Sequence, residues 1–277
     1  MWKTLIVVVS EQNKDRELDN FLARVKAQGI EVIEIEPALY VKRYKIGTVC
    51  QKESLLLTDT PIVAITAKKA GIALVGVRKQ ETKLPVPAPY ILQGLDGIQI
   101  SYLKMVYSRF HHIPLIVAET ERLVIQELTS SQTELFFGLC REAGLKTEAH
   151  SIKERDKIVQ QQFLQAYIEN QYNFYGYGIW GLIEKGNGKL VGIAGVEDRE
   201  DCLELGYAIV PEKRRIGYAK EACQAIFCYL KTELELEGKI KSFVPKENIA
   251  SQKTAQSIGM LQAKDIFKEF YCYERIL

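Results

Sequence analysis

The chain has 277 residues, of which 47% are hydrophobic and 26% charged, a balance typical of a soluble globular protein of one or two domains. Its net charge of +2 is too small to indicate binding to nucleic acid or to an anionic membrane surface. The N-terminal apolar run from Leu5 to Val9 is too short for a membrane span or a signal sequence, so we expect a cytoplasmic protein.

The six cysteines form no CxxC pair, and with three histidines in the chain no metal-ligand spacing appears. We therefore expect no metal site. The simplest interpretation of the cysteines is that they are reduced thiols, as in a cytoplasm.

Strand and helix signals alternate through the first 113 residues. A continuous apolar, β-branched run from Thr4 to Ser10 is typical of a strand buried on both faces, and helical periodicity follows from Asp15 to Gln28. This βαβ rhythm predicts an α/β domain with a Rossmann-like parallel sheet and right-handed crossovers. Further strands are expected at 30–35, 54–58, 72–77 and 90–93, and further helices at 61–70 and 98–110.

Asp59 lies at the end of the strand over 54–58, just before Thr60 and Pro61. An acidic side chain followed by proline is typical of a helix start. We therefore interpret Asp59 as the N-cap of the next helix and prefer this to a role as a cation ligand.

The same region, from Leu55 to Pro61 and on through the Ala-Gly-Ile segment at 70–72 to residues 90–95, resembles the last third of haloacid-dehalogenase-like phosphatases. That family's nucleophile is the first aspartate of an Asp-x-Asp-x-Thr loop after the first strand. Here the strand is followed by Ser10, Glu11, Gln12 and Asn13, which leaves covalent phosphoryl transfer without its carboxylate. The resemblance implies a catalytically inactive domain over residues 1–113 that acts as a scaffold, a docking surface or a ligand sensor.

Beyond a boundary near Pro114, the signals change to those of an α+β domain over residues 114–277. A strand is expected from Ile116 to Leu128, followed by amphipathic helices between 132 and 172. The run Lys185-Gly186-Asn187-Gly188 predicts a hairpin turn between strands at 177–184 and 189–197. Later strands are expected at 203–210, 239–244 and 268–276, and later helices at 217–233 and 249–258.

The segment from Val210 to Ala219 reads as the end of a strand, a basic turn and the start of a helix. Such an order builds an anion site from backbone N–H groups. Arg214 and Arg215 add positive charge, and Gly217 lets a ligand approach the backbone. The ligand expected here is a phosphate or a pyrophosphate.

The pattern Arg214-x-x-Gly217-x-Ala219, preceded by Val210-Pro211, resembles the acetyl-CoA pyrophosphate loop of the GNAT N-acetyltransferase superfamily. It resembles most the branch that acetylates ribosomal-protein N-termini, and it implies a mixed α+β GNAT fold for 114–277. Three further segments resemble that branch in the same order, namely the opening strand at 119–125, the central hairpin at 177–183 and 189–195, and the second cofactor segment at 247–251 with 258–260.

The resemblance implies acetyl-CoA as the cosubstrate and assigns its contacts. Backbone groups near Ala208, Ile209 and Val210 would pair with the pantetheine amides, as an added strand would. Asn248 and Ser251 would approach the cofactor from the opposite side, although helix capping explains these two residues as well. The pyrophosphate would be held by the segment Arg214, Arg215, Ile216, Gly217, Tyr218 and Ala219.

Acetyl transfer to an amine requires a neutral nucleophile and a proton for the leaving thiolate. Glu204, on the strand beside the thioester, is the candidate general base, acting through water; an ordinary exposed strand carboxylate is the alternative. Many family members place a tyrosine acid at the position that is Ala255 here. The general acid therefore stays open among Tyr175, Tyr177, Tyr271 and Tyr273.

The expected function is acetyl transfer from acetyl-CoA to a primary amine, a small molecule or a peptide N-terminus, directly within a ternary complex. The alternative is a non-catalytic acetyl-CoA-binding sensor or interaction protein. A bifunctional phosphatase–acetyltransferase is disfavoured by the first-strand loop. The acceptor and the role of the first domain are left open. The oligomeric state is also open, and a homo-oligomer is one of the alternatives.

Overall fold

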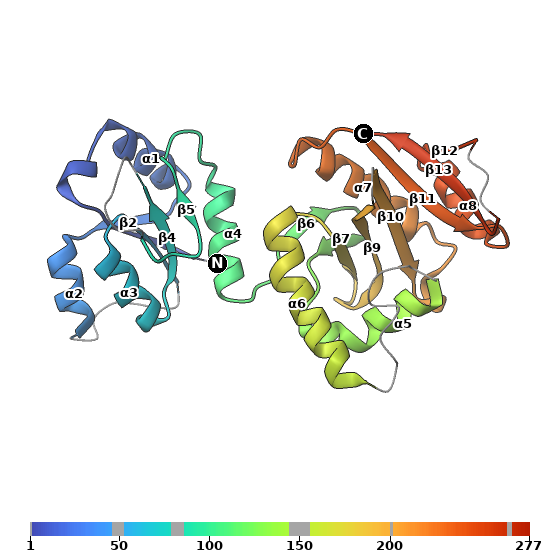
Figure 1. The fold of residues 1–277 in the computed structure, drawn as a ribbon, viewed down its shortest axis with the longest axis horizontal. Helices are drawn as coiled ribbons and strands as arrows, with labels where there is room; N and C mark the ends of the chain where they lie inside the picture. Colours follow the sequence, from blue (N-terminus) through green and yellow to red (C-terminus); the bar gives the residue numbers. More distant parts are fainter. Residues whose placement is uncertain (1, 46–52, 79–85, 144–155, 200–201, 265–267) are drawn as a thin grey trace. The chain divides into compact units, whose positions relative to one another are not determined.

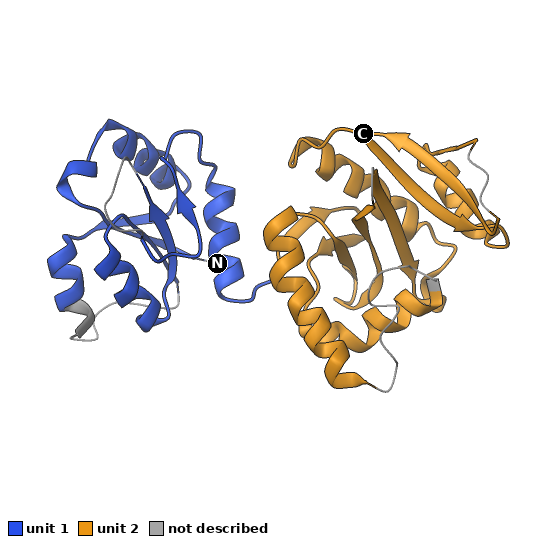
Figure 2. Ribbon diagram, in the orientation of Figure 1, with its two compact units in different colours: residues 1–113 blue, residues 114–277 orange. Residues whose placement is uncertain are grey.

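The computed structural model describes residues 2–45, 53–78, 86–143, 156–199, 202–264 and 268–277. It divides into two compact units, residues 1–113 and residues 114–277 (Figure 2). Each unit has its own sheet and its own clusters of buried apolar side chains.

In the first unit the sheet has five strands in the order β2-β1-β3-β4-β5 (Figure 1). Every neighbouring pair is parallel, which confirms the parallel sheet predicted from the βαβ rhythm. The elements of this unit are β1 (Thr4–Val8), η1 (Glu11–Asn13), α1 (Arg16–Ala27), β2 (Glu31–Glu34), α2 (Pro37–Lys45), β3 (Ser54–Thr58), α3 (Pro61–Ala70), β4 (Ala73–Val77), β5 (Ile91–Leu92) and α4 (Ile100–Phe110).

The central strand β1 is buried on both faces because its side chains alternate between two cores. Leu5 and Val7 belong to a cluster with side chains of α1 and α4. Ile6 and Val8 belong to a second cluster with side chains of α2 and α3. The predicted doubly buried strand is therefore confirmed.

The sheet of the second unit has eight strands in the order β12-β13-β11-β10-β9-β8-β7-β6. Among the described strands, only β10 and β11 are parallel neighbours. The elements are β6 (Ile116–Glu119), β7 (Leu123–Gln126), η2 (Ser130–Gln132), α5 (Thr133–Ala143), α6 (Lys157–Tyr175), β8 (Ile179–Glu184), β9 (Leu190–Arg199), β10 (Cys202–Ile209), η4 (Pro211–Lys213), α7 (Tyr218–Thr232), β11 (Lys239–Pro245), α8 (Ile249–Ser257), β12 (Leu261–Gln262) and β13 (Phe270–Ile276).

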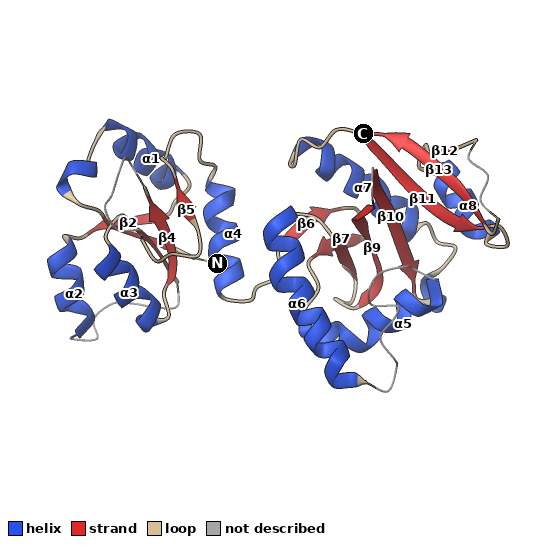
Figure 3. Cartoon of the chain, viewed as in Figure 1, coloured by secondary structure: helices blue, strands red, loops and turns tan. Residues whose placement is uncertain are grey.

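Helices cover both faces of this sheet (Figure 3). On one face, Ile193 and Ala208 pack with apolar side chains of α5 and α6. On the other, Leu205 and Ile209 pack with side chains of α7 and α8. Alternation along β10 therefore places Glu204, Gly206 and Ala208 on the α5–α6 face.

The expected single strand from Ile116 to Leu128 is wrong, because the segment forms two antiparallel strands, β6 and β7. Thr120 closes the turn between them: its hydroxyl donates to the carbonyl of Leu123 at 3.2 Å and accepts from the Leu123 amide at 2.9 Å. The consequence for the site is that Arg122 lies at a turn and not within a strand.

Candidate functional site

The sheet of the second unit opens between β10 and β11. In the part of the chain that the structure describes, these strands pair only at Leu203 with Ile240 and at Glu204 with Lys241. The Ser242 hydroxyl then donates to the carbonyl of Leu205 at 3.1 Å, and beyond this bond the strands spread apart (Figure 1). The later half of β10 thus has an edge onto which an extended ligand can add like a strand.

The register of β10 decides which backbone groups face this split. The Val210 amide donates to the carbonyl of Val191 at 3.0 Å, so Val210, and by alternation Ala208, direct their backbone groups toward β9. Ile209 therefore directs its amide and carbonyl toward the split. Of the three predicted pantetheine contacts, only Ile209 has its backbone turned to the open edge.

The predicted pyrophosphate loop runs from Pro211 to the start of α7. Arg215 has φ 62° and Gly217 has φ 93°, so two positions of the loop adopt left-handed backbone. An arginine in this region is unusual and strained, and such strain tends to persist at functional sites. In the described chain, none of the amides of residues 215–220 donates to another protein group, and no side chain caps α7. This run of unbonded N–H groups at a helix N-terminus is suited to bind an anion.

The three basic side chains of the loop differ in their partners. Lys213 forms an ion pair with Glu184 at 2.7 Å, and Arg214 forms one with Glu142 at 2.5 Å. Arg214 also donates to the carbonyl of Ile209 at 2.8 Å. Arg215 is exposed and, within the described residues, has no ion pair. The charge expected from Arg214 is thus compensated by Glu142, whereas no acid among the described residues pairs with Arg215.

Glu184, at the end of β8, is hydrogen-bonded to residues at both ends of the loop. Its carboxylate accepts from Lys213 at 2.7 Å, from the Tyr218 hydroxyl at 2.5 Å and from Asn187 at 2.5 Å. Hydrogen bonds from Lys213 and then Tyr218 lower the pKa of Glu184, and the bond to Glu184 raises the pKa of Tyr218. The acid therefore stays ionised and ties η4 to the first residue of α7.

Helix α8 brings the second predicted cofactor segment to the split. The Asn248 side-chain oxygen accepts from the Ser251 amide at 3.0 Å, so Asn248 is the N-cap of α8. Sequence reasoning missed Tyr207, which lies on β10 and donates its hydroxyl to the carbonyl of Ser251 at 3.0 Å. Burial raises the pKa of Tyr207. This tyrosine links β10 to α8. The only sign of it in the sequence was a tyrosine within the expected strand over 203–210.

Glu204 lies on the α5–α6 face of β10, directly opposite Glu197 of β9. Its carboxylate is ion-paired with Arg199, whose guanidinium lies over the ring of Phe243 at 4.1 Å. The Tyr167 hydroxyl donates to Glu197 at 3.1 Å. The predicted base therefore belongs to a cluster of polar side chains from β9, β10 and α6.

The open question of the general acid concerns four tyrosines. Tyr273 is buried, and burial raises its pKa. Tyr177 donates to Asp198 at 2.8 Å, and burial together with this bond raises its pKa. The Tyr271 ring lies 5.5 Å from the Lys246 ammonium group. Ala255, where a family tyrosine is expected, is fully buried in the core.

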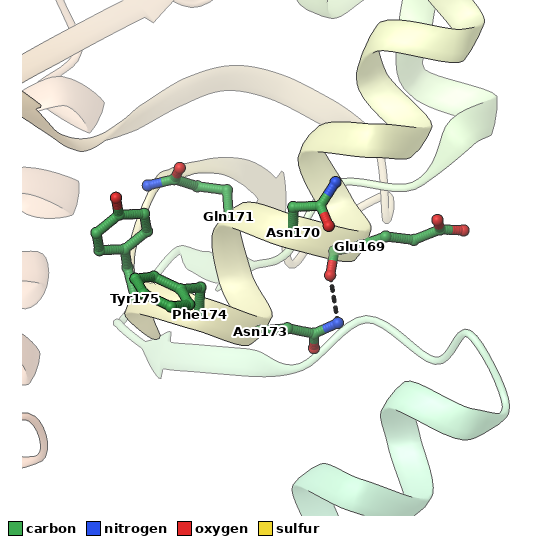
Figure 4. Close-up of a pocket in the computed structure, with 6 residues that line it drawn as sticks. All are labelled: Glu169, Asn170, Gln171, Asn173, Phe174 and Tyr175. Carbon is green, nitrogen blue, oxygen red and sulfur yellow. Dashed lines mark hydrogen bonds between the residues drawn. The ribbon is translucent and has the colours of Figure 1, made fainter. Parts of the chain in front are cut away.

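The fourth tyrosine, Tyr175, lines a surface hollow along the last turns of α6 (Figure 4). Asn173 donates there to the backbone carbonyl of Glu169, and Phe174 is 82% exposed. All the lining residues come from this one helix, and none belongs to β10, the loop or α8. The hollow is therefore separate from the predicted cofactor contacts.

In the first unit, Asp59 does not cap α3, and the predicted cap is wrong; Thr60 occupies the N-cap position. The Asp59 carboxylate instead accepts from the Ser10 amide at 3.0 Å, the Ser10 hydroxyl at 2.5 Å, Asn13 at 2.5 Å and Thr60 at 2.7 Å. Burial alone would raise its pKa, but these bonds outweigh burial and lower it. The loop after β1 lies against Asp59, so the Asp59 carboxylate already accepts hydrogen bonds from Ser10 and Asn13.

Two other features, a metal centre and a membrane-spanning helix, can be assessed in the described residues. No group of three or more His, Cys, Asp or Glu side chains there is arranged to hold a metal ion. No helix in those ranges combines the length and the apolar character that crossing a membrane requires.

Comparisons with known proteins bear on the second unit. A family model described as an acetyltransferase (GNAT) domain matches residues 122–261. The chain is similar to the uncharacterised N-acetyltransferase YoaA of Bacillus subtilis, with 26% identity over 163 residues that cover 56% of this chain and 87% of YoaA. It is also similar to the uncharacterised N-acetyltransferase YjdG of the same organism, with 29% identity over 89 residues that cover 31% of this chain and 52% of YjdG. Among solved structures, an acetyltransferase (GNAT family) from Bacillus anthracis aligns with 22% identity and a TM-score of 0.45, over 57% of this chain and 96% of that one.

The family match and the relatives named as N-acetyltransferases support an enzyme, and they give no support to the alternative of a non-catalytic sensor. The matched residues span half of the chain, from the β6–β7 turn to β12, and include the loop and both strands of the split. The chain therefore belongs to the GNAT acetyltransferase family, which uses acetyl-CoA.

Proposed function

We propose that residues 114–277 transfer an acetyl group from acetyl-CoA directly to a primary amine of a small molecule or of a peptide N-terminus. The observation that carries this proposal is the open edge of β10 leading into a loop whose amides at 215–220 are unbonded within the described chain. An extended pantetheine arm and a pyrophosphate would match these two features in that order.

In this proposal, Ile209 pairs with pantetheine through its backbone amide, because its carbonyl already accepts from Arg214. Ala208 and Val210 only line the split. The amides of Arg215, Ile216, Gly217, Tyr218 and Ala219 hold the pyrophosphate, and the exposed Arg215 side chain adds charge to that hold. Arg214 acts indirectly, since its guanidinium ties the loop to Ile209 and Glu142. Asn248 and Ser251 contact the cosubstrate from α8.

Acetyl-CoA supplies the acetyl thioester, and the chain supplies placement and proton transfer. Glu204 would take the amine proton through a water as the new N–C bond forms and the C–S bond breaks. That proton would pass through solvent to the leaving thiolate and give the free thiol of CoA. The ion pair of Glu204 with Arg199 would hold the carboxylate in one orientation. The neighbouring Glu197 would favour an acceptor that approaches as a cation.

For residues 1–113 we propose a haloacid-dehalogenase-like, Rossmann-like domain without phosphoryl chemistry. The strand order β2-β1-β3-β4-β5 is a common doubly wound order, and it supports this assignment. Ser10 lies where a nucleophilic aspartate would be expected, and Asp59 is bonded to Ser10, Asn13 and Thr60. These contacts occupy the Asp59 carboxylate, which supports a domain that acts as a scaffold, a docking surface or a ligand sensor.

The first test measures free-thiol release from acetyl-CoA by the full chain against a panel of amines, amino acids, polyamines and short peptides. We expect one acceptor class to stimulate release. Gly217→Ala should weaken CoA binding by about tenfold or more, because alanine strains the left-handed position that orients the amides. Gly188→Ala is the matched control, since Gly188 has φ 68° and an added Cβ there would meet nothing within 4 Å. Equal CoA binding by both variants would contradict the proposed loop.

A further inference from the structure

Arg122, at the turn between β6 and β7, contacts the cofactor loop from the side. Its Nη1 donates to the carbonyl of Ile216 at 2.8 Å, and its guanidinium lies over the ring of Tyr218 at 4.7 Å. A Cβ built on Gly217 would lie 3.4 Å from its Nη2. Arg122 is therefore packed against three consecutive residues of the loop.

The bond to Ile216 fixes the direction of the next amide. A trans peptide is planar, so the carbonyl of Ile216 and the N–H of Gly217 point in opposite directions. Because the carbonyl is directed to Arg122, the Gly217 amide is directed away from it. This peptide joins Ile216 to Gly217, which is itself left-handed, and rotation of this one peptide plane would reverse the Gly217 amide.

Glu221, in the first turn of α7, holds Arg122 in this position. Its carboxylate accepts from the Arg122 amide at 3.0 Å and from Nε at 2.7 Å, and it lies 2.6 Å from Nη2. The Glu221 side chain is 18% exposed, against 40% for Arg122. A planar guanidinium bound at two nitrogens by one acid has a fixed orientation, with its remaining nitrogen left for Ile216.

We propose that Arg122 is a positioning residue that sets the peptide between Ile216 and Gly217 so that the loop amides converge on the pyrophosphate of acetyl-CoA. This inference rests on the proposed cofactor site. The amides of residues 215–220 would then be arranged before the ligand arrives, and binding would not have to cover the free-energy cost of ordering them. In this arrangement Arg122 acts through the loop and not through a ligand contact, because Nε and Nη2 are bound to Glu221 and Nη1 is bound to the carbonyl of Ile216.

A merely structural role would be a different explanation, in which Arg122 only ties the β6–β7 turn to α7. The two explanations predict different effects on ligands with and without the pyrophosphate. A positioning role affects ligands that carry the pyrophosphate, whereas general loosening affects every ligand of the split and lowers the unfolding temperature without ligand.

The experiment uses the full chain and measures dissociation constants for CoA, by calorimetry, and for pantetheine, by nuclear magnetic resonance titration. Arg122→Gln should weaken CoA binding by about tenfold or more and change pantetheine binding by less than about twofold. Arg122→Lys should weaken CoA binding by an intermediate factor, because one ammonium group can pair with Glu221 but cannot also hold the Ile216 carbonyl in the same geometry.

Lys185→Gln is the matched control. Its side chain forms an ion pair with Glu119 at 3.0 Å, and its backbone amide donates to the carbonyl of Arg122. It therefore adjoins the same turn, and within the described residues no hydrogen bond or ion pair joins it to the loop. It should bind CoA as the unaltered chain does. A parallel loss of CoA and pantetheine binding in Arg122→Gln would overturn the inference, as would CoA binding that is unchanged in Arg122→Gln while Gly217→Ala loses it. Unchanged CoA binding in Gly217→Ala as well would instead overturn the proposed cofactor site.

Discussion

At the scale of single residues, Glu204 and Glu197 form a pair of carboxylates facing each other across β10 and β9. Glu197 receives a hydrogen bond from Tyr167, whereas Glu204 is paired with Arg199. We predict that Glu204→Gln lowers kcat by about 10²- to 10⁴-fold, the usual contribution of a general base. CoA affinity should stay within about twofold, because Glu204 lies before the open edge that the cosubstrate would use. Thiol release at saturating acetyl-CoA and a CoA titration measure the two quantities.

The comparison variant for this prediction is Glu197→Gln, which removes the facing carboxylate from the same surface. We expect Glu197→Gln to raise KM for a cationic acceptor and to lower kcat less than Glu204→Gln does. Loss of kcat in Glu197→Gln together with near-normal turnover in Glu204→Gln would move the role of the base to Glu197.

The local structure of the proposed cofactor loop could be predicted because its residues are contiguous and their chemistry is local. The strand end, the basic turn and Gly217 are readable within ten residues. The contacts of Arg122 could not be predicted in this way, since its partners Ile216 and Glu221 are 94 and 99 residues away in the chain. The contact of Tyr207 could not be predicted for the same reason, because its hydroxyl donates to the carbonyl of Ser251, 44 residues away in the chain.

At the scale of elements, most strands and helices follow from apolar periodicity, and the exceptions have physical causes. Helix α2 (Pro37–Lys45) was not predicted, because among its side chains that the structure describes only Tyr40 is fully buried. A single buried side chain gives no helical repeat. The β6–β7 hairpin was expected as one strand, because the turn is closed by a threonine side chain and not by the Asn-Gly type of signal.

The start of α8 allows a test that separates capping from ligand contact. Asn248→Ala removes the acceptor for the Ser251 amide and should cost about 1 kcal/mol of unfolding free energy. Asn248→Asp keeps that acceptor but removes the side-chain N–H donors. If Asn248 also contacts acetyl-CoA, Asn248→Asp should keep its stability and lose about three- to tenfold in CoA affinity.

Chemical unfolding and a CoA titration on both variants give the two readouts. Thr60→Ala is a control in the other unit, because Thr60 occupies the N-cap position of α3 and its side chain makes no capping bond to that helix. It should leave CoA affinity unchanged. Full CoA affinity in Asn248→Asp would limit Asn248 to capping α8.

At the scale of the whole molecule, each buried apolar cluster lies within one of the two units. Two clusters consist of residues from Trp2 to Tyr107, and two consist of residues from Leu123 to Tyr273. The boundary between the two units lies between Ile113 and Pro114, shortly after α4, whose C-cap is His111. A unit with its own core can in principle fold alone.

Residues 114–277 also contain every contact assigned to acetyl-CoA, from Ile209 to Ser251. We therefore predict that a fragment of residues 114–277 folds cooperatively and binds CoA with an affinity within about threefold of that of the full chain, since no binding group is removed. A fragment of residues 1–113 should fold without binding CoA. Circular dichroism during thermal unfolding and calorimetric titration measure folding and binding separately. A folded 114–277 fragment with strongly reduced CoA affinity would mean that the first unit contributes to the cofactor site. Full affinity with lost turnover on the identified acceptor would instead place the contribution of the first unit in acceptor recognition.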